Sequence, residues 1–375
     1  MTRERTILVT GAYGLVGREL VRLLVEKTDA SVIATGRKTE RLASLAADLD
    51  PGRVTTQVLD VLDPSAARAA CSRAGLLINC VGPYLESGEG VARAAIESGA
   101  SYVDFASEQV HYQRLKKLAP GARERGSFLL TGAGLVPGLS AVLTLRGAEQ
   151  LPLVDSVEIV YAQARMPAGD AGLGSLLTGV LEAGHSPVIL RDGQQVPVRL
   201  GDDRRRMTLP EPIGAVDMIG FPSLEALTLA ERLSPRSISM YWLLGDIPPV
   251  LFTLIRLLQP HRRPWAYRLL RRLSEATLAR DYERGLAKGV PVDALVRVSV
   301  AAGSQRWRAT LRLPEGGAAP TAYLPVLAAR RFLEGRFEHV GLVTPIEAFP
   351  HEALFREIAE LGWKLDLEES ADALE

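Results

Sequence analysis

The sequence is poor in cysteine and carries no excess of charge. Its 375 residues include two cysteines, Cys71 and Cys80, too few for a disulfide framework or a cysteine-ligated metal site. Lysine and arginine together number 44, as do aspartate and glutamate, so no basic field favours nucleic acid as a partner. The five histidines show no metal-ligand spacing, and we expect no bound metal. No signal-peptide pattern precedes the first expected strand, and we expect a cytoplasmic protein.

Long uncharged apolar runs are also missing. The most apolar stretch, Ile238–Leu258, contains Asp246 and Arg256 and is broken by Pro248 and Pro249. It therefore falls short of the roughly 20 residues that a membrane span requires. The chain is also too long for one ordinary hydrophobic core, which predicts two domains.

What the sequence does have is a glycine-rich turn close to its N-terminus. Ile7–Val9 predicts a strand buried on both faces, and leucines at helical spacing follow from Leu15. In this strand-to-helix context, glycines let the backbone approach a pyrophosphate, and the first N–H groups of the helix bind it. The alternative is a tight turn that binds another ligand or none. The residues that we assign to cofactor binding in this turn are Gly11, Tyr13, Gly14, Leu15, Val16 and Gly17.

The end of the second expected strand bears on the choice of cofactor. Ser31–Thr35 predicts that strand, and Gly36, Arg37 and Lys38 follow it. An acidic residue at this place would bind the ribose 2′-hydroxyl of NAD, whereas arginine and lysine suit a 2′-phosphate. The sequence therefore predicts NADP(H) rather than NAD(H). The alternative is that Arg37 is a solvated loop residue.

Strand and helix patterns alternate about six times over the first part of the chain, which predicts a parallel sheet with helices on both faces. In such sheets ligands bind at the carboxyl ends of the strands. Those ends carry further cofactor-binding candidates: Asp60, Val61, Cys80, Val81, Gly82 and Pro83.

Several segments at these strand ends resemble the saccharopine dehydrogenase-like reductases. They are Asn79–Tyr84, Gly99–Asp104 with Glu108, Leu135–Ser140, and, near the C-terminus, Gly341–Pro345, Ala348–Phe349 and Leu361–Gly362. The resemblance covers the beginning and end of the chain but hardly the middle. It implies an α/β fold, in which a Rossmann-type doubly wound parallel sheet carries an inserted α+β domain. It also implies hydride transfer to a C=N or C=C bond, and it includes a branch of trans-acting enoyl reductases.

The expected domains follow from this resemblance and from a change of pattern near residue 138. Residues 1–138 form the dinucleotide-binding domain, 139–321 the substrate and dimerisation domain, and 322–375 the C-terminal helices that return to the first domain. In the second domain we expect strands with turns between them, a loop and helix over 169–184, and a hairpin from residues 294–300 and 306–313.

Arginines follow the apolar stretch, at positions 262, 263, 268, 271 and 272, with Trp265 and Leu269 between them. This pattern is typical of a basic amphipathic helix at a membrane surface, so we include peripheral membrane contact among the expected partners. We prefer the alternative, a subunit interface in a homodimer or a lid over an apolar pocket. Each interpretation favours a bulky apolar substrate.

Three side chains are candidates for proton transfer. Tyr84, Asp104 and Glu108 occur where the nicotinamide end of the cofactor should lie, and a buried carboxyl with a raised pKa can act as an acid. Tyr84 has packing or a backbone hydrogen bond as its alternative role, and Asp104 has the holding of a loop. His111 is close enough in sequence to be considered. The string from Tyr112 to Lys116 fits Y-x-x-x-K, but it falls on the wrong helix and we reject it.

We therefore expect an NADP(H)-dependent oxidoreductase that reduces C=N or C=C in a small or bulky apolar molecule. One alternative is an enoyl reductase that acts on a lipid or polyketide intermediate. Another is a dinucleotide-binding scaffold or membrane-surface protein without turnover.

Overall fold

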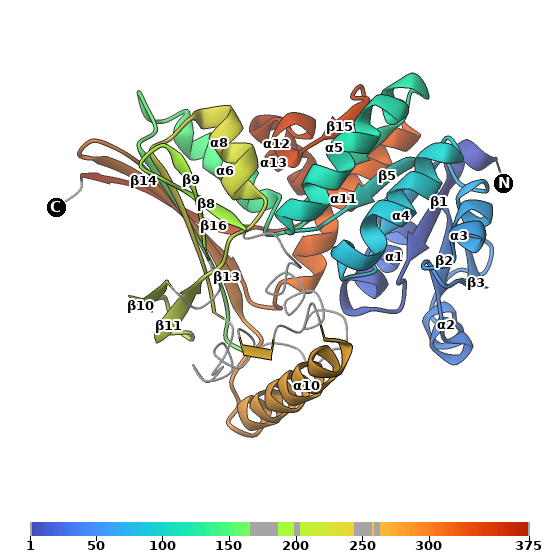
Figure 1. The fold of residues 1–375 in the computed structure, drawn as a ribbon, viewed down its shortest axis with the longest axis horizontal. Helices are drawn as coiled ribbons and strands as arrows, with labels where there is room; N and C mark the ends of the chain where they lie inside the picture. The colour runs from blue at the N-terminus through green and yellow to red at the C-terminus, as the bar shows by residue number, and fades with distance from the viewer. Residues whose placement is uncertain (1, 166–186, 199–202, 244–256, 259–262, 374–375) are drawn as a thin grey trace. The chain divides into compact units, whose positions relative to one another are not determined.

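A computed structural model describes residues 2–165, 187–198, 203–243, 257–258 and 263–373 (Figure 1). The chain divides into two compact units. The first unit contains Met1–Leu139 and Ala318–Trp363, and the second contains Ser140–Gly317 and Lys364–Glu375.

The first unit is built on a seven-stranded parallel sheet in the order β15-β6-β5-β4-β1-β2-β3. Strand order reverses between β1 and β4, where Ile7 of β1 pairs with Leu76 of β4. The connections that follow the two strands at such a point lead in opposite directions, which leaves room for a ligand at the carboxyl ends. The strands are β1 (Thr6–Thr10), β2 (Ser31–Gly36), β3 (Val54–Val58), β4 (Leu76–Asn79), β5 (Ser101–Asp104), β6 (Phe128–Leu130) and β15 (Gly341–Val343).

Helices cover both faces of this sheet. Leu8, Leu77 and Leu129 point to one face and form a core with α3, α4 and α5, while α1 packs with α11 on the other face. Helix α3 begins at Pro64, where the Asp63 carboxylate accepts from the N–H groups of Ser65 and Ala66. The helices are α1 (Leu15–Lys27), α2 (Thr39–Ala46), α3 (Pro64–Cys71), α4 (Tyr84–Glu97), α5 (Gln109–Glu124), α11 (Ala318–Leu333), α12 (Pro345–Ala348) and α13 (His351–Glu360).

The second unit contains a mixed sheet in the order β10-β11-β12-β7-β13-β14-β16, with β8 paired to β12 and β9. Strands β12 and β7 are parallel, and the other pairs are antiparallel. The strands are β7 (Ser156–Gln163), β8 (Val188–Arg191), β9 (Gln194–Pro197), β10 (Arg204–Thr208), β11 (Ala215–Gly220), β12 (Ser237–Trp242), β13 (Ala294–Ala302), β14 (Gln305–Leu313) and β16 (Asp366–Ala373). The described helices are α6 (Leu139–Ala148), α8 (Glu225–Leu233) and α10 (Pro264–Ala287).

Residues 322–375 are not helical to their end as expected, because β16 is a strand that pairs with β14 of the second unit. Helix α4 begins at Tyr84, so Tyr84 lies in the first turn of this helix. The loop and helix expected over 169–184, and most of the apolar stretch 238–258, lie outside the described residues.

Within the described ranges, no helix combines the length and apolar character needed to cross a bilayer.

Candidate functional site

The glycine-rich turn lies at the point where strand order reverses. Gly11 has a φ of +65°, a conformation that favours glycine. A Cβ on Gly11 would lie 2.9 Å from the carbonyl oxygen of Cys80, and one on Gly17 would overlap the carbonyl of Gly11. The loops after β1 and β4 are thus packed backbone against backbone, which leaves no room for side chains at these glycines.

The glycine-rich turn leads directly into the N-terminus of α1. The preceding residue, Gly14, has no side chain to cap the helix, and no acidic residue lies in the first turn. The first-turn N–H groups, including those of Leu15, Val16 and Gly17, have no acceptor within the helix, and the helix dipole favours an anion there. The residues therefore fit the pyrophosphate of a dinucleotide.

An aromatic and cationic group lies at the end of β2. The ring of Tyr13 covers Gly36, where a Cβ would overlap it, and the Tyr13 hydroxyl accepts from the backbone N–H of Arg37 at 3.1 Å. The guanidinium of Arg41 lies 5.7 Å from the centre of the same ring. Arg37, Lys38 and Arg41 are exposed, so three cations lie at the surface here. Arg41 was not among the predicted residues, although it lies three residues after Lys38 in the first turn of α2.

The other cofactor candidates lie in the loops after β3 and β4. Asp60 is exposed, and its carboxylate accepts from the N–H of Leu62 at 3.1 Å. Cys80, Val81, Gly82 and Pro83 are half-buried and lead into α4. Nothing in these contacts assigns them a role, and their part in cofactor binding stays a prediction.

Asn79, the last residue of β4, joins three strands beneath the site. Its Oδ1 accepts from the Thr10 hydroxyl at 2.6 Å and from the Val81 N–H at 3.0 Å, and its Nδ2 donates to the Tyr102 hydroxyl at 3.1 Å. Asn79 is fully buried, so these bonds fix the relative positions of β1, β4 and β5 where the loops begin. Asn79 belongs to the segment Asn79–Tyr84, which resembles the saccharopine dehydrogenase-like reductases. Nothing in the spacing of that segment indicated that Asn79 joins three strands.

The hydroxyl of Tyr84 forms a hydrogen bond within the protein. The hydroxyl donates to the carbonyl of Asn79 at 2.9 Å, and the ring packs against His111 at a centroid distance of 5.6 Å. Burial, followed by the nearby Asp104 carboxylate, raises the pKa of Tyr84 well above its ordinary value. This geometry favours the alternative role named for Tyr84, packing with a backbone hydrogen bond.

Asp104, at the end of β5, accepts hydrogen bonds on both carboxylate oxygens. Oδ1 accepts from the Ala106 N–H at 3.0 Å, the Thr131 hydroxyl at 2.7 Å and the Gly132 N–H at 3.1 Å. Oδ2 lies 2.7 Å from Nε2 of His111. Burial works to raise the pKa of Asp104, but the His111 imidazole and these hydrogen bonds outweigh it and lower that pKa. The lowered pKa runs against our expectation of an acid and favours the holding of a loop.

His111 is completely buried on α5 and uses one ring nitrogen for Asp104. Its Nδ1 is also buried and has no hydrogen-bond partner among the described residues. Because Nε2 bonds to a carboxylate, that nitrogen is the donor, and in the neutral ring Nδ1 is left as an acceptor. The ring thus presents an unused polar atom beside Tyr84. His111 lies seven residues after Asp104 in the sequence, and the two side chains come into contact because the chain turns at residues 105–108.

Glu108 differs from Asp104 in its partners. Its Oε1 accepts from the Tyr84 N–H at 3.3 Å and its Oε2 from the Ser107 N–H at 3.0 Å. Burial raises the pKa of Glu108, and its partners do not reverse that effect. Of the three predicted proton-transfer residues, Glu108 is the one whose pKa is shifted in the direction that acid catalysis at neutral pH requires.

A further buried carboxylate lies in the second unit. Glu225 begins α8, and its Oε1 accepts from the Ser140 hydroxyl at 2.5 Å, while its other oxygen accepts from the Ser223 hydroxyl. Burial raises the pKa of Glu225, although both hydroxyls work to lower it. This cluster was not among the sequence predictions, because Ser140 lies 85 residues before Glu225 in the chain.

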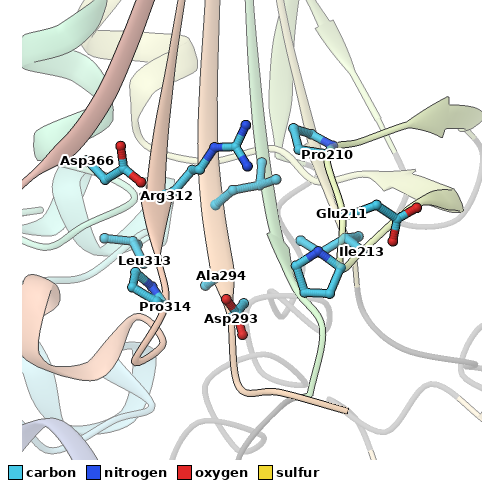
Figure 2. A pocket seen from close by; sticks show the side chains of 11 residues that line it. Pro210, Glu211, Ile213, Asp293, Ala294, Arg312, Leu313, Pro314 and Asp366 are labelled. Carbon is cyan, nitrogen blue, oxygen red and sulfur yellow. The ribbon is translucent and has the colours of Figure 1, made fainter.

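The second unit also contains a small cavity of about 140 Å³ beside β13 and β14 (Figure 2). Arg312 and Asp366 lie on one side of it, and Glu211 and Ile213 lie on the other. This volume is below that of ordinary ligand pockets, so the cavity does not accommodate a dinucleotide.

Residues 7–130 match the sequence profile of the saccharopine dehydrogenase NADP binding domain. The chain is 29% identical over 138 residues to the lipid droplet localized protein of Caenorhabditis elegans, covering 34% of this chain and 32% of that protein. It is 29% identical over 144 residues to the human saccharopine dehydrogenase-like oxidoreductase, covering 34% of each. A Mycobacterium tuberculosis protein, assigned by name to the trans-acting enoyl reductases, is 31% identical over 109 residues, covering 28% of this chain and 26% of that protein. The matches span about a third or less of these relatives.

A solved structure extends the likeness to nearly the whole chain. Apo saccharopine dehydrogenase (L-Glu forming) from Saccharomyces cerevisiae superimposes with a TM-score of 0.67, covering 98% of this chain and 99% of that one. The identity is 15%, so this is a likeness of fold, namely a parallel Rossmann-like sheet with a second, mixed-sheet domain.

Proposed function

Because residues 7–130 match the saccharopine dehydrogenase NADP binding domain, we propose that this chain is an NADP(H)-dependent reductase of the saccharopine dehydrogenase-like class. The observation that carries the proposal is the turn of Gly11, Gly14 and Gly17, which opens α1 where strand order reverses. When bound, the nicotinamide supplies the hydride, and the protein provides binding, orientation and one proton.

The preference for NADP(H) over NAD(H) rests on the cations at the end of β2. Arg37, Lys38 and Arg41 would bind the 2′-phosphate, and Tyr13 would support them, because its hydroxyl accepts from Arg37 and keeps its own proton to donate. No acidic residue in the segment 36–38 is available to bind an unmodified ribose.

For the proton we propose Glu108. Burial raises the pKa of Glu108, which is the direction that acid catalysis at neutral pH requires. Asp104 and Asn79 would position it indirectly, by fixing β5 and β4, and His111 would add a second titratable group beside Tyr84.

The bond reduced is C=N or C=C, in a small or bulky apolar molecule. A lipid or polyketide enoyl group is a second candidate, which the name of the mycobacterial relative supports. The remaining alternative is a dinucleotide-binding scaffold without turnover.

Calorimetric titration with NADPH and NADH tests the proposed cofactor. We expect NADPH to bind more tightly, and Arg37→Gln and Arg41→Gln each to weaken NADPH about 10-fold or more while leaving NADH unchanged. Arg93→Gln, which removes an exposed arginine from α4, is the matched control and should change neither. Absence of heat with both dinucleotides would contradict the proposal.

The Glu108→Gln variant separates an enzyme from a scaffold. We expect it to bind NADPH normally and to lose NADPH oxidation with a panel of imine and enoyl substrates by about 100-fold. Tyr84→Phe, which keeps the ring and loses only a bond to a backbone carbonyl, should retain most of the turnover. Loss of turnover in Tyr84→Phe alone would restore the tyrosine as the acid.

A further inference from the structure

Helix α10, which covers Pro264–Ala287, exposes large apolar side chains in regular order. Trp265, Leu269 and Leu273 are 52%, 44% and 46% exposed. Successive residues of a helix are rotated by about 100°, so residues at i, i+4 and i+8 fall within a stripe about 80° wide. Exposure of isolated apolar residues is normal, but an ordered stripe marks an interaction surface.

Positive charge follows this stripe. Arg263, Arg268 and Arg272 are exposed, and the last two lie three and seven residues after Trp265, along one border of the stripe. The sequence from residue 260 to residue 274 contains five arginines and no acidic residue, in a chain whose formal net charge is zero. Cations are therefore concentrated in the half of α10 that exposes Trp265, Leu269 and Leu273.

We propose that this face of α10, defined by Trp265, Arg268, Leu269, Arg272 and Leu273, binds the surface of an anionic phospholipid bilayer. Tryptophan is favoured at the boundary between headgroups and acyl chains, and leucines on the same stripe enter the acyl region. The arginine stems lie along the apolar layer while their guanidinium groups bind the phosphates.

Charge distinguishes this partner from a second copy of the chain. The core of a protein–protein interface is depleted in charged residues, and two copies of this face would bring arginines together. An anionic bilayer instead offers a phosphate to each arginine and an apolar layer to the stripe. The complementarity therefore favours lipid.

Co-sedimentation with unilamellar vesicles tests the proposal. We expect the full chain to pellet with phosphatidylcholine vesicles that contain about a third phosphatidylglycerol and to stay largely in solution with phosphatidylcholine alone. Arg268→Gln/Arg272→Gln should reduce partitioning about 10-fold or more, at about 1 kcal/mol for each cation. Trp265→Ala/Leu269→Ala should weaken it to a similar degree.

The control removes the same charge elsewhere in the second unit. Arg191→Gln/Arg206→Gln takes two exposed arginines from β8 and β10 and should leave partitioning within about twofold. An equal loss in this control would mean that net charge alone drives binding and would overturn the proposal. Failure of the unmodified chain to pellet with the anionic vesicles would also overturn the proposal. So would the finding that the chain is a dimer, that Leu269→Glu makes it a monomer, and that neither protein binds the vesicles.

Discussion

Asp104 in the first unit and Glu225 in the second are both completely buried, yet their pKa values shift in opposite directions. Burial opposes ionisation in each case. Asp104 has an imidazole on one oxygen and three further donors on the other, and together they outweigh burial. Glu225 accepts from the hydroxyls of Ser140 and Ser223 and from its own backbone N–H, which are all neutral donors, and burial prevails. Burial alone therefore does not decide the pKa of these two carboxyls, because the directly bonded imidazole and the three further donors reverse its effect at Asp104.

The largest effect is expected from the Asp104→Asn substitution, which tests the first half of this contrast. The substitution removes the charge that faces His111 and puts amide protons against an N–H donor, so we expect the free energy of unfolding to fall by about 3–5 kcal/mol. Urea denaturation followed by circular dichroism measures the change. Asp60→Asn, which changes an exposed carboxylate in the loop after β3, is the control and should have little effect. Equal losses in the two variants would mean that the network around Asp104 contributes nothing.

A smaller effect is expected in the second unit. Ser140→Ala removes one of the hydroxyls that bind Glu225 and leaves a buried oxygen without that donor, which should cost about 1–3 kcal/mol. Ser72→Ala, whose hydroxyl is exposed and bonds only to a backbone carbonyl in its own helix, should cost less than Ser140→Ala in the same denaturation assay.

The smallest effect is expected from Glu225→Gln at acid pH. A raised pKa means that the folded state favours the protonated carboxyl, so this group contributes stability below its ordinary pKa of 4.5 and loses it as pH rises through the raised value. Glutamine resembles the protonated form, and the variant should lie within about 1 kcal/mol of the native chain at acid pH. Its relative stability should then improve as pH rises.

Asp104→Asn should have the opposite pH dependence. The lowered pKa of Asp104 contributes stability above its ordinary value of 3.8, which is lost as pH falls. If the stabilities of Asp104→Asn and Glu225→Gln, each relative to the native chain, changed with pH in the same direction, the contrast between the two carboxyls would be contradicted.

The sequence predicted the first unit in most respects because its signals are local. The apolar run of Ile7–Val9, the glycines that follow and the arginine at position 37 are each read within a few residues, and the parallel sheet follows from their repetition. The network around Asn79 was not predictable in this way. Its partners Thr10 and Tyr102 come from other strands and meet it only when β1, β4 and β5 pair.

The second unit was harder to predict, because its strands carry weaker patterns. Residues 366–373 read as a polar segment with four acidic residues, yet they form the edge strand β16, whose side chains are largely exposed. An edge strand lacks a hydrogen-bonded neighbour on one side, and since β16 buries none of the side chains that the structure describes, it also lacks the alternation that identifies a strand. The arginines and leucines of α10 did indicate an amphipathic helix, but its full extent to Ala287 was not predicted.

The path of the chain between its two units has a consequence for biosynthesis. The backbone crosses from one unit to the other after Leu139, after Gly317 and again after Trp363. Strand β6 therefore stays without its partner until β15 has been made, and β14 stays without its partner until β16 has been made. A nascent copy carries an unpaired edge at β6 while about 200 further residues are added, and a chaperone that shields open strands would be most useful in that period.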